Sequence, residues 1–129
     1  MRYVLALGAA LALSGPIHAD DQAEPHLTHS VFFDLKDDDA ASIQALIDGC
    51  YEYLAPHDGI IYFSAGARHK DYTRDVNDLG FDVALTIVFE STAAQDAYQV
   101  TEPHLQFIED FNGNWESVRV FDSLAPAAE

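Results

Sequence analysis

Six segments with regular hydrophobic periodicity constrain the fold of this chain more than any other feature. Four of them are short apolar or alternating runs, which is typical of strands, and they span residues 27–35, 60–67, 82–90 and 115–122. Two others repeat apolar residues at helical spacing, at residues 40–55 and 92–100, and a short helical piece is predicted from 104 to 111. The order strand, helix, strand, strand, helix, strand predicts a ferredoxin-like α+β fold, with the helices on one face of a four-stranded antiparallel sheet.

The first predicted helix has clear boundary signals. Three aspartates at residues 37–39 precede it, where a carboxylate can cap the free N–H groups and favour the positive end of the helix. No calcium-ligand loop of known spacing follows them, so we interpret them as a cap rather than a metal site. Pro56 ends the helix. Cys50, the only cysteine of the chain, lies on its apolar stripe, which excludes an intrachain disulfide and indicates an inert core thiol.

The sheet face away from the helices is not cleanly polar. Phe32, Val88, Val118 and Val120 are out of phase with the other apolar residues of their strands. A sheet with two apolar faces needs a second cover, and the same sheet of a second copy supplies it about a two-fold axis. We therefore predict a homodimer that becomes monomeric when Val118 or Val120 is replaced by a charged residue. The alternative is that these four residues are scattered surface side chains.

The first 19 residues have the layout of a secretory signal peptide. Arg2 supplies a positive charge, residues 4–13 form an apolar run, and the small residue Ala19 marks the expected cleavage site. The run is too short for a spanning helix, which needs about 20 residues. We therefore expect export to the periplasm or the exterior without stable membrane anchoring. The expected organisation after cleavage is a flexible leader, one domain and a tail, at residues 20–25, 26–124 and 125–129.

The charge of the chain is strongly acidic, with 22 Asp and Glu against 6 Lys and Arg and a net charge of −16 at pH 7. Nucleic-acid binding is not expected, because phosphate recognition needs clustered cations. Three cations, Arg68, Lys70 and Arg74, fall between residues 66 and 80. They could attract a carboxylate ligand to the mouth of a pocket. The alternative is a solvated loop in which these cations pair with neighbouring aspartates.

Several short motifs follow one another in a specific order along the chain. They are His29-Ser30-Val31-Phe32-Phe33-Asp34-Leu35-Lys36-Asp37, Asp82-Val83-Ala84-Leu85, Phe89-Glu90-Ser91, Tyr98, Pro103-His104 and Val120-Phe121-Asp122. Together these motifs resemble the stress-responsive A/B barrel (Dabb) family, over residues 26–124. The resemblance implies ferredoxin-like subunits whose sheets pair into a dimeric α+β barrel.

The resemblance also implies three candidate site residues. In one plant branch of the family, polyketide cyclases close a linear polyketide by aldol condensation. Their pocket is lined by a first-strand histidine, a second-helix tyrosine and a histidine six residues beyond it, and the matching residues here are His29, Tyr98 and His104. The cyclase-type motif His-Pro-x-His is replaced by Thr101-Glu102-Pro103-His104. The first histidine is therefore lost and the proline is shifted by one position.

These three side chains suit acid–base chemistry. An imidazole can take a proton near neutral pH because its free pKa is near 6.5, and an aldol or proton-abstraction step needs one base and one donor to the developing oxyanion. We assign His104 as the base and Tyr98 or His29 as the donor, with no metal or organic cofactor. The alternatives are a hydrogen-bonded core histidine at position 29, a brace of the broken helix at 104 and a packed core ring at 98.

Three functions remain open at this point. The first is a pocket between sheet and helices that binds a small apolar or aromatic acid and performs cofactor-free lyase-like or cyclase-like chemistry, or oxygenase-like chemistry by analogy of fold alone. The second is a binding module that uses the same pocket without turnover. The third is a stress-related structural dimer without a pocket. A cavity beside His104 distinguishes the first two from the third, and turnover distinguishes the first from the second.

Overall fold

The computed structural model describes Gly15 and residues 23–127. The predicted signal peptide, apart from Gly15, and the first part of the predicted leader therefore lie outside the described residues. Within the described part, no helix has the length and apolar character that crossing a bilayer requires.

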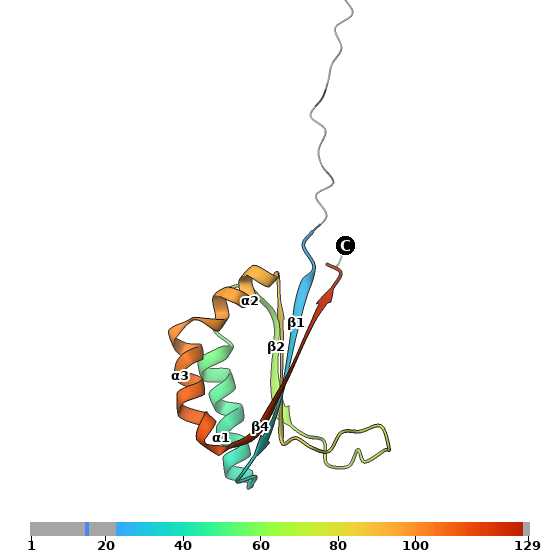
Figure 1. Cartoon of the computed structure of the whole chain (residues 1–129), viewed down its shortest axis with the longest axis vertical. Helices are drawn as coiled ribbons and strands as arrows, with labels where there is room; N and C mark the ends of the chain where they lie inside the picture. The colour runs from blue at the N-terminus through green and yellow to red at the C-terminus, as the bar shows by residue number, and fades with distance from the viewer. Residues whose placement is uncertain (1–14, 16–22, 128–129) are drawn as a thin grey trace, which may run out of the picture.

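The elements follow the predicted order, as Figure 1 shows. The strands are β1 (His26–Leu35), β2 (Ile60–Ala67), β3 (Val83–Phe89) and β4 (Trp115–Ala125). The helices are α1 (Ala40–Gly49), α2 (Thr92–Gln99) and α3 (Glu102–Phe111), with a π-helical turn η1 (Cys50–Leu54) after α1 and a 3-10 turn η2 (Asn112–Asn114) before β4. The sheet has the order β2-β3-β1-β4 with antiparallel neighbours. The predicted α+β, ferredoxin-like fold is confirmed.

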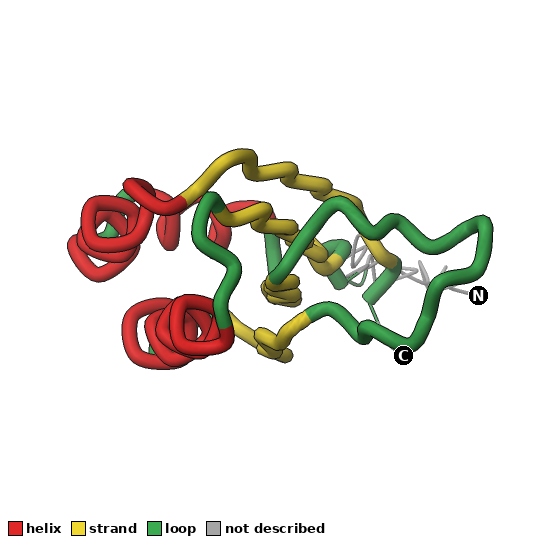
Figure 2. Tube along the Cα trace, turned by 90° about the horizontal axis from the view of Figure 1, so that it is seen from below, coloured by secondary structure: helices red, strands yellow, loops and turns green. Residues whose placement is uncertain are grey.

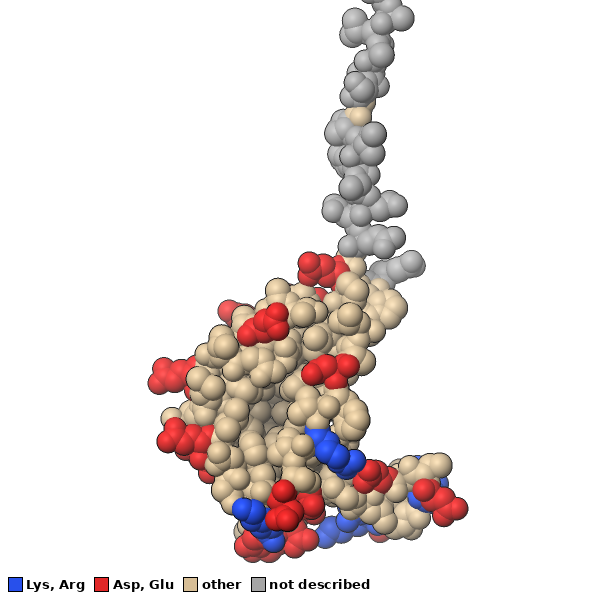
Figure 3. Space-filling view, in the orientation of Figure 1, with Lys and Arg blue, Asp and Glu red and all other residues tan. Residues whose placement is uncertain are grey.

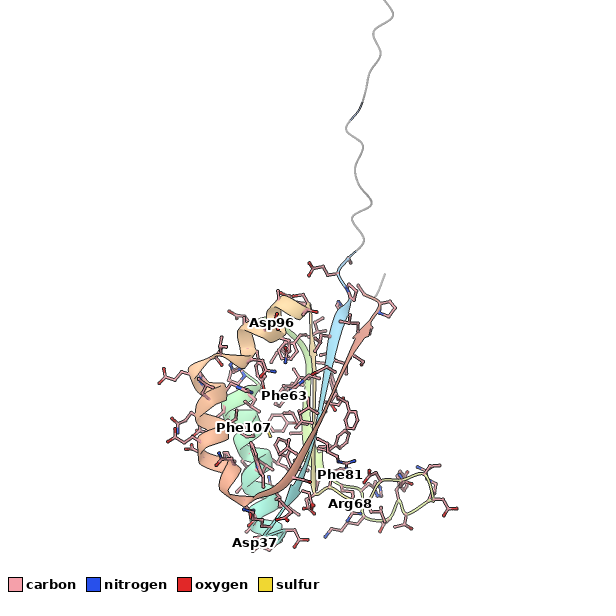
Figure 4. The ribbon with its side chains drawn as sticks, viewed as in Figure 1. Asp37, Phe63, Arg68, Phe81, Asp96 and Phe107 are labelled. Carbon is pink, nitrogen blue, oxygen red and sulfur yellow. The ribbon has the colours of Figure 1, made fainter. Side chains whose placement is uncertain are left out.

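The three helices cover one face of the sheet, and the loop of residues 68–82 projects on the opposite side (Figures 1 and 2). The core lies between the helices and the sheet, where alternate residues of β1 and β3 are buried. From the helical layer, Phe107 points towards the sheet (Figure 4) and is 3% exposed. Cys50 is fully buried in this core, and its burial raises the pKa of the thiol to about 12.

Each helix begins at a side-chain cap. Asp39 accepts a hydrogen bond from the Ser42 N–H at 2.7 Å, and Ser91 caps α2 in the same way. The predicted start of the last helix at residue 104 was wrong, because Thr101 caps α3 and Pro103 lies inside its first turn. Proline is tolerated there, since its missing N–H would have had no partner within the helix.

The prediction that Val118 and Val120 lie on the face away from the helices was wrong. They lie opposite Phe33 and Val31 in the β1–β4 ladder, and those two residues are buried under the helices. A register shift near the start of β4 places Trp115 on this face as well, although its spacing from the valines is odd. Strict alternation, on which the prediction was based, fails at such a bulge.

The other face of the sheet is nevertheless partly apolar. Phe32 lies edge-on to Phe81 and Phe121, with ring centroids 5.1 and 5.9 Å apart. Phe121 is 56% exposed, and Val88 lies opposite Thr28 on the same face as Phe32. The interpretation of an apolar second face therefore holds for Phe32 and Val88, and Phe121 takes the place of the two valines.

Candidate functional site

A cavity of about 210 Å³ lies between the sheet and the helices α2 and α3. It opens as the hollow that Figure 3 shows between α3 and β4. An engineered cavity of about 150 Å³ is enough to hold benzene, whereas drug-sized ligands occupy roughly 300–1,000 Å³. The cavity therefore has the size for a single aromatic ring with a small substituent.

The three residues predicted from the sequence all line this cavity. His29 comes from β1, Tyr98 from α2 and His104 from α3. The Tyr98 ring contacts both imidazoles, with centroid separations of 6.4 Å to His29 and 4.7 Å to His104. The rest of the lining is mainly aliphatic and aromatic, and it includes no Asp, Glu, Lys or Arg.

His29 is held by a carboxylate from the neighbouring strand. Its side chain is 6% exposed, and its Nδ1 atom lies 2.6 Å from Oδ1 of Asp122. The two residues are opposite one another in the β1–β4 ladder, so the pairing follows directly from the register. An ionised carboxylate can only accept a hydrogen bond, so Nδ1 carries a proton and Nε2 is left for a molecule in the cavity.

His104 presents the complementary arrangement. Its Nδ1 atom is buried and has no hydrogen-bond partner among the described residues. Burial lowers the pKa of this imidazole, the backbone of Gln99 opposes that effect, and the nearby His29 and His57 add to the lowering. The ring is therefore neutral at pH 7, and Nε2 is the nitrogen that a bound molecule can reach.

Tyr98 is the most deeply buried of the three, at 2% exposure. Burial raises the pKa of its hydroxyl above the ordinary value of 10, and the nearby Cys50 adds to the rise. The phenol therefore keeps its proton at neutral pH and serves as a donor rather than a base.

Two residues near the site received no role from the sequence. Asp122 belongs to the closing Val-Phe-Asp motif, but its contact with His29 becomes visible only once β1 and β4 are paired in register. His57 follows Pro56 in a turn, and its ring lies 4.9 Å from that of Tyr98. A histidine in a polar turn carries no sequence signal that would distinguish it from a solvated one.

The cations of residues 68–82 do not reach the cavity. Their loop lies on the sheet face opposite the helices (Figure 2), so the hypothesis that they attract a ligand to the pocket mouth was wrong. Arg68, at the base of the loop in Figure 4, donates from Nε to the Phe81 carbonyl at 3.0 Å. Arg74 bonds Asn77, and Asp78 pairs at 2.8 Å with Arg119 of β4. These bonds brace the loop against the sheet.

The chemistry of the site is that of a small, mostly apolar chamber with convergent proton donors and acceptors. A neutral imidazole, a protonated phenol and a second imidazole backed by a carboxylate are the groups that acid–base catalysis uses. Within residues 23–127, no group of three or more His, Cys, Asp or Glu side chains is arranged to hold a metal ion.

Comparison with known families supports this fold. The model of the stress-responsive A/B barrel domain matches residues 27–125, which is most of the chain. The chain belongs to the Dabb family. The resemblance inferred from the motifs is therefore confirmed. A comparison with curated proteins yields no match.

Solved structures share this fold at low sequence identity. A Dabb-family protein with a ferredoxin-like fold from Mesorhizobium loti has a TM-score of 0.63 and 17% identity, over 78% of this chain and 96% of that one. Hydroxynitrile lyase from Passiflora edulis has a TM-score of 0.65 and 21% identity, over 83% and 98%. A dimeric ferredoxin-like protein of unknown function from Thermobifida fusca has a TM-score of 0.64 and 13% identity, over 78% and 92%. At these identities, the likeness establishes the fold.

Proposed function

We propose that this Dabb-family protein binds a small uncharged organic molecule in the cavity and performs cofactor-free acid–base chemistry on it, of the lyase or cyclase type. One observation carries the proposal: two imidazoles line the same apolar cavity, and each has Nδ1 engaged or buried so that Nε2 is left for the ligand. The hydroxynitrile lyase among the similar structures is an example of lyase chemistry on this fold.

The protonation states assign the roles. His104 is neutral, so its Nε2 atom is the base that removes a proton from a hydroxyl group or from a carbon next to a carbonyl. Tyr98 keeps its proton and donates to the oxygen on which negative charge develops. With Nδ1 of His29 donating to the Asp122 carboxylate, the Nε2 atom of His29 can accept a hydrogen bond from a hydroxyl group of the ligand, so the donor role belongs to Tyr98.

The charge around the cavity favours an uncharged ligand over an aromatic acid. No Lys or Arg lines the cavity, and the Asp122 carboxylate lies directly behind His29. A carboxylate ligand would lose its hydration without gaining a cation in return, which is costly in an apolar site. Small aromatic aldehydes, alcohols and hydroxynitriles meet the requirements of size, neutrality and hydrogen bonding.

The proposal includes a homodimer formed through the face that carries Phe32, Val88 and Phe121. Exposed aromatic side chains on one sheet face need a cover, and several structures with this fold are described as dimeric, from Thermobifida fusca, Bacteroides fragilis and a Jannaschia species. We also propose that the mature protein acts outside the cytoplasm, in the periplasm or beyond, on the basis of the signal-peptide pattern in the first 19 residues.

A thermal-shift screen with these uncharged compounds tests the binding step, with His104→Gln as the matched variant. A ligand at 100 times its Kd adds about 2.7 kcal/mol, which corresponds to a rise on the order of 10 °C for a domain of this size. We expect hits in the wild type that are weakened in the variant. Turnover of each hit is then followed at the same protein concentration. Hits that are equally strong in His104→Gln would contradict the proposed site.

The pH dependence of binding provides a second check. The pKa of His104 is lowered below 6.5, so binding that uses its neutral form is complete above pH 6.5 and is lost as the pH falls through the lowered pKa. Affinity that instead rises on acidification would show that the ligand uses the charged imidazole.

Binding without turnover is the second candidate function. Thr101 stands where the cyclase-type motif has its first histidine, so one side chain of that chemistry is absent. Saturable binding that depends on His104, together with no conversion of any bound compound, would favour this function.

A further inference from the structure

A histidine outside the cavity is bonded to the elements that carry the site. The Nδ1 atom of His57 lies 2.8 Å from the carbonyl oxygen of Leu54, at the end of η1, and its Nε2 atom lies 2.7 Å from Oγ1 of Thr101. Its ring also lies edge-on to Tyr98, with centroids 4.9 Å apart. His57 lines a separate groove behind Tyr98 rather than the cavity itself.

Thr101 connects this histidine to both neighbouring site residues. Its hydroxyl accepts the backbone N–H of His104 at 3.3 Å and so caps α3, and it donates to the Tyr98 carbonyl at 3.1 Å. A cap fixes the direction in which a helix begins. Because His104 lies in the first turn of α3, the position of its imidazole depends on the Thr101 hydroxyl.

The hydrogen bonds of His57 to Leu54 and Thr101 and that of Thr101 to Tyr98 depend on one another, because the donors share few protons. A carbonyl oxygen only accepts, so the Nδ1 atom of His57 carries a proton that it donates to Leu54. The Thr101 hydroxyl has a single proton, which it can give either to the Tyr98 carbonyl or to a neutral His57 ring. All three bonds form together only when both ring nitrogens of His57 donate. The other ionisable groups that face His57 or share its groove are Asp58, Glu90, Tyr98 and His104.

We propose that His57 is a positioning residue of the site, which acts through Thr101 to hold the first turn of α3 and thereby to fix the His104 imidazole against Tyr98. The Dabb motifs in this chain do not include His57, and its partner Thr101 is the residue that departs from the cyclase-type pattern. The pair thus supplies a support that the family motifs of this chain do not contain. The inference builds on the proposed function only in taking His104 as a site residue.

Two substitutions at position 57 separate its two hydrogen bonds. In His57→Gln, the amide can reach Thr101 in place of Nε2. In His57→Asn, the shorter amide can replace only the bond of Nδ1 to Leu54. At position 101, Thr101→Val removes the hydroxyl with little change of shape, and Thr101→Ser keeps it.

The readout is an NMR titration of the His104 imidazole without ligand, assigned with His104→Gln, together with the nuclear Overhauser contacts between the Tyr98 and His104 rings. Loosening the start of α3 admits water to His104 and relieves the burial that lowers its pKa. We expect the pKa of His104 to rise towards 6.5 and the ring contacts to weaken in His57→Asn and Thr101→Val. In Thr101→Ser, both should stay closer to the wild type. Because His57 itself adds to the lowering of the His104 pKa, His57→Gln is the control that removes the same imidazole. The pKa should rise less in His57→Gln than in His57→Asn, and the ring contacts should stay closer to those of the wild type.

Equal His104 titration and equal ring contacts in His57→Asn and His57→Gln would overturn the proposal. Ring contacts that weaken only in Thr101→Val would also overturn it, since Thr101 would then act alone. Because no ligand is present, these outcomes are independent of the screen that tests the proposed function. A failed screen combined with the expected titration would leave the positioning role intact.

Discussion

Replacing Asp122 by alanine removes the partner of the most buried imidazole in the site. The ring N–H of His29 would lose its acceptor, and leaving a buried donor unsatisfied costs about 1–3 kcal/mol. The Asp122 side chain is 46% exposed, so water can partly replace it, and we expect the lower end, about 1 kcal/mol. That loss corresponds to a fall in Tm of about 4–8 °C for a domain of this size.

The assay is thermal unfolding at a fixed protein concentration, because association makes Tm depend on concentration. Asp122→Asn is the matched control, since its amide oxygen can still accept from His29, and its Tm should fall less. A double-mutant cycle with His29→Gln should show coupling of about 1 kcal/mol between the two side chains. Equal Tm values for Asp122→Ala and the wild type, or additive effects in the cycle, would refute the reasoning.

Three further predictions concern the sheet face, the core thiol and a turn. Phe121→Asp should convert the proposed dimer to monomers in light scattering, whereas Val120→Asp, with the same charge on the helix-covered face, should leave it dimeric. The fully buried Cys50, whose pKa is raised to about 12, should not react with a thiol reagent until the protein unfolds, and reaction at the rate of a free thiol would contradict its placement. Gly59→Ala should lower the free energy of unfolding by at least about 1 kcal/mol in urea. The reason is that Gly59 has φ 81° and that a Cβ there would lie 2.7 Å from that of Ala94. An unchanged urea midpoint would contradict this strained backbone conformation.

The fold was predictable because local signals agree with one another along the whole chain. The alternation in β1, the aspartate cap of α1 and Pro56 at its end each specify one element, and no element needed a distant contact to be identified. The family motifs then placed His29, Tyr98 and His104 on the right elements. The sequence also predicted the apolar sheet face correctly at Phe32.

The errors that concern the sheet, the site and the loop have a common physical origin in long-range pairing. Val118 and Val120 were assigned to the wrong face because the bulge near the start of β4 depends on how β4 pairs with β1, which the periodicity of one strand does not reveal. Asp122 was missed as the partner of His29 for the same reason. The loop cations at Arg68 and beyond were misplaced because the direction of a long loop is set by its bonds to the sheet, such as that of Arg119.

The most direct test of the central claim uses Trp115, the single tryptophan of the chain, which lines the cavity. Its fluorescence is followed while small uncharged aromatic alcohols and hydroxynitriles are titrated into the wild type and into Val120→Phe, where a larger side chain fills part of the cavity. We predict a saturable change of emission in the wild type and an affinity at least about 10-fold weaker in the variant, a loss of about 1.4 kcal/mol. Identical binding curves for the two proteins, or no saturable change with any compound, would contradict the claim that this cavity is the ligand site.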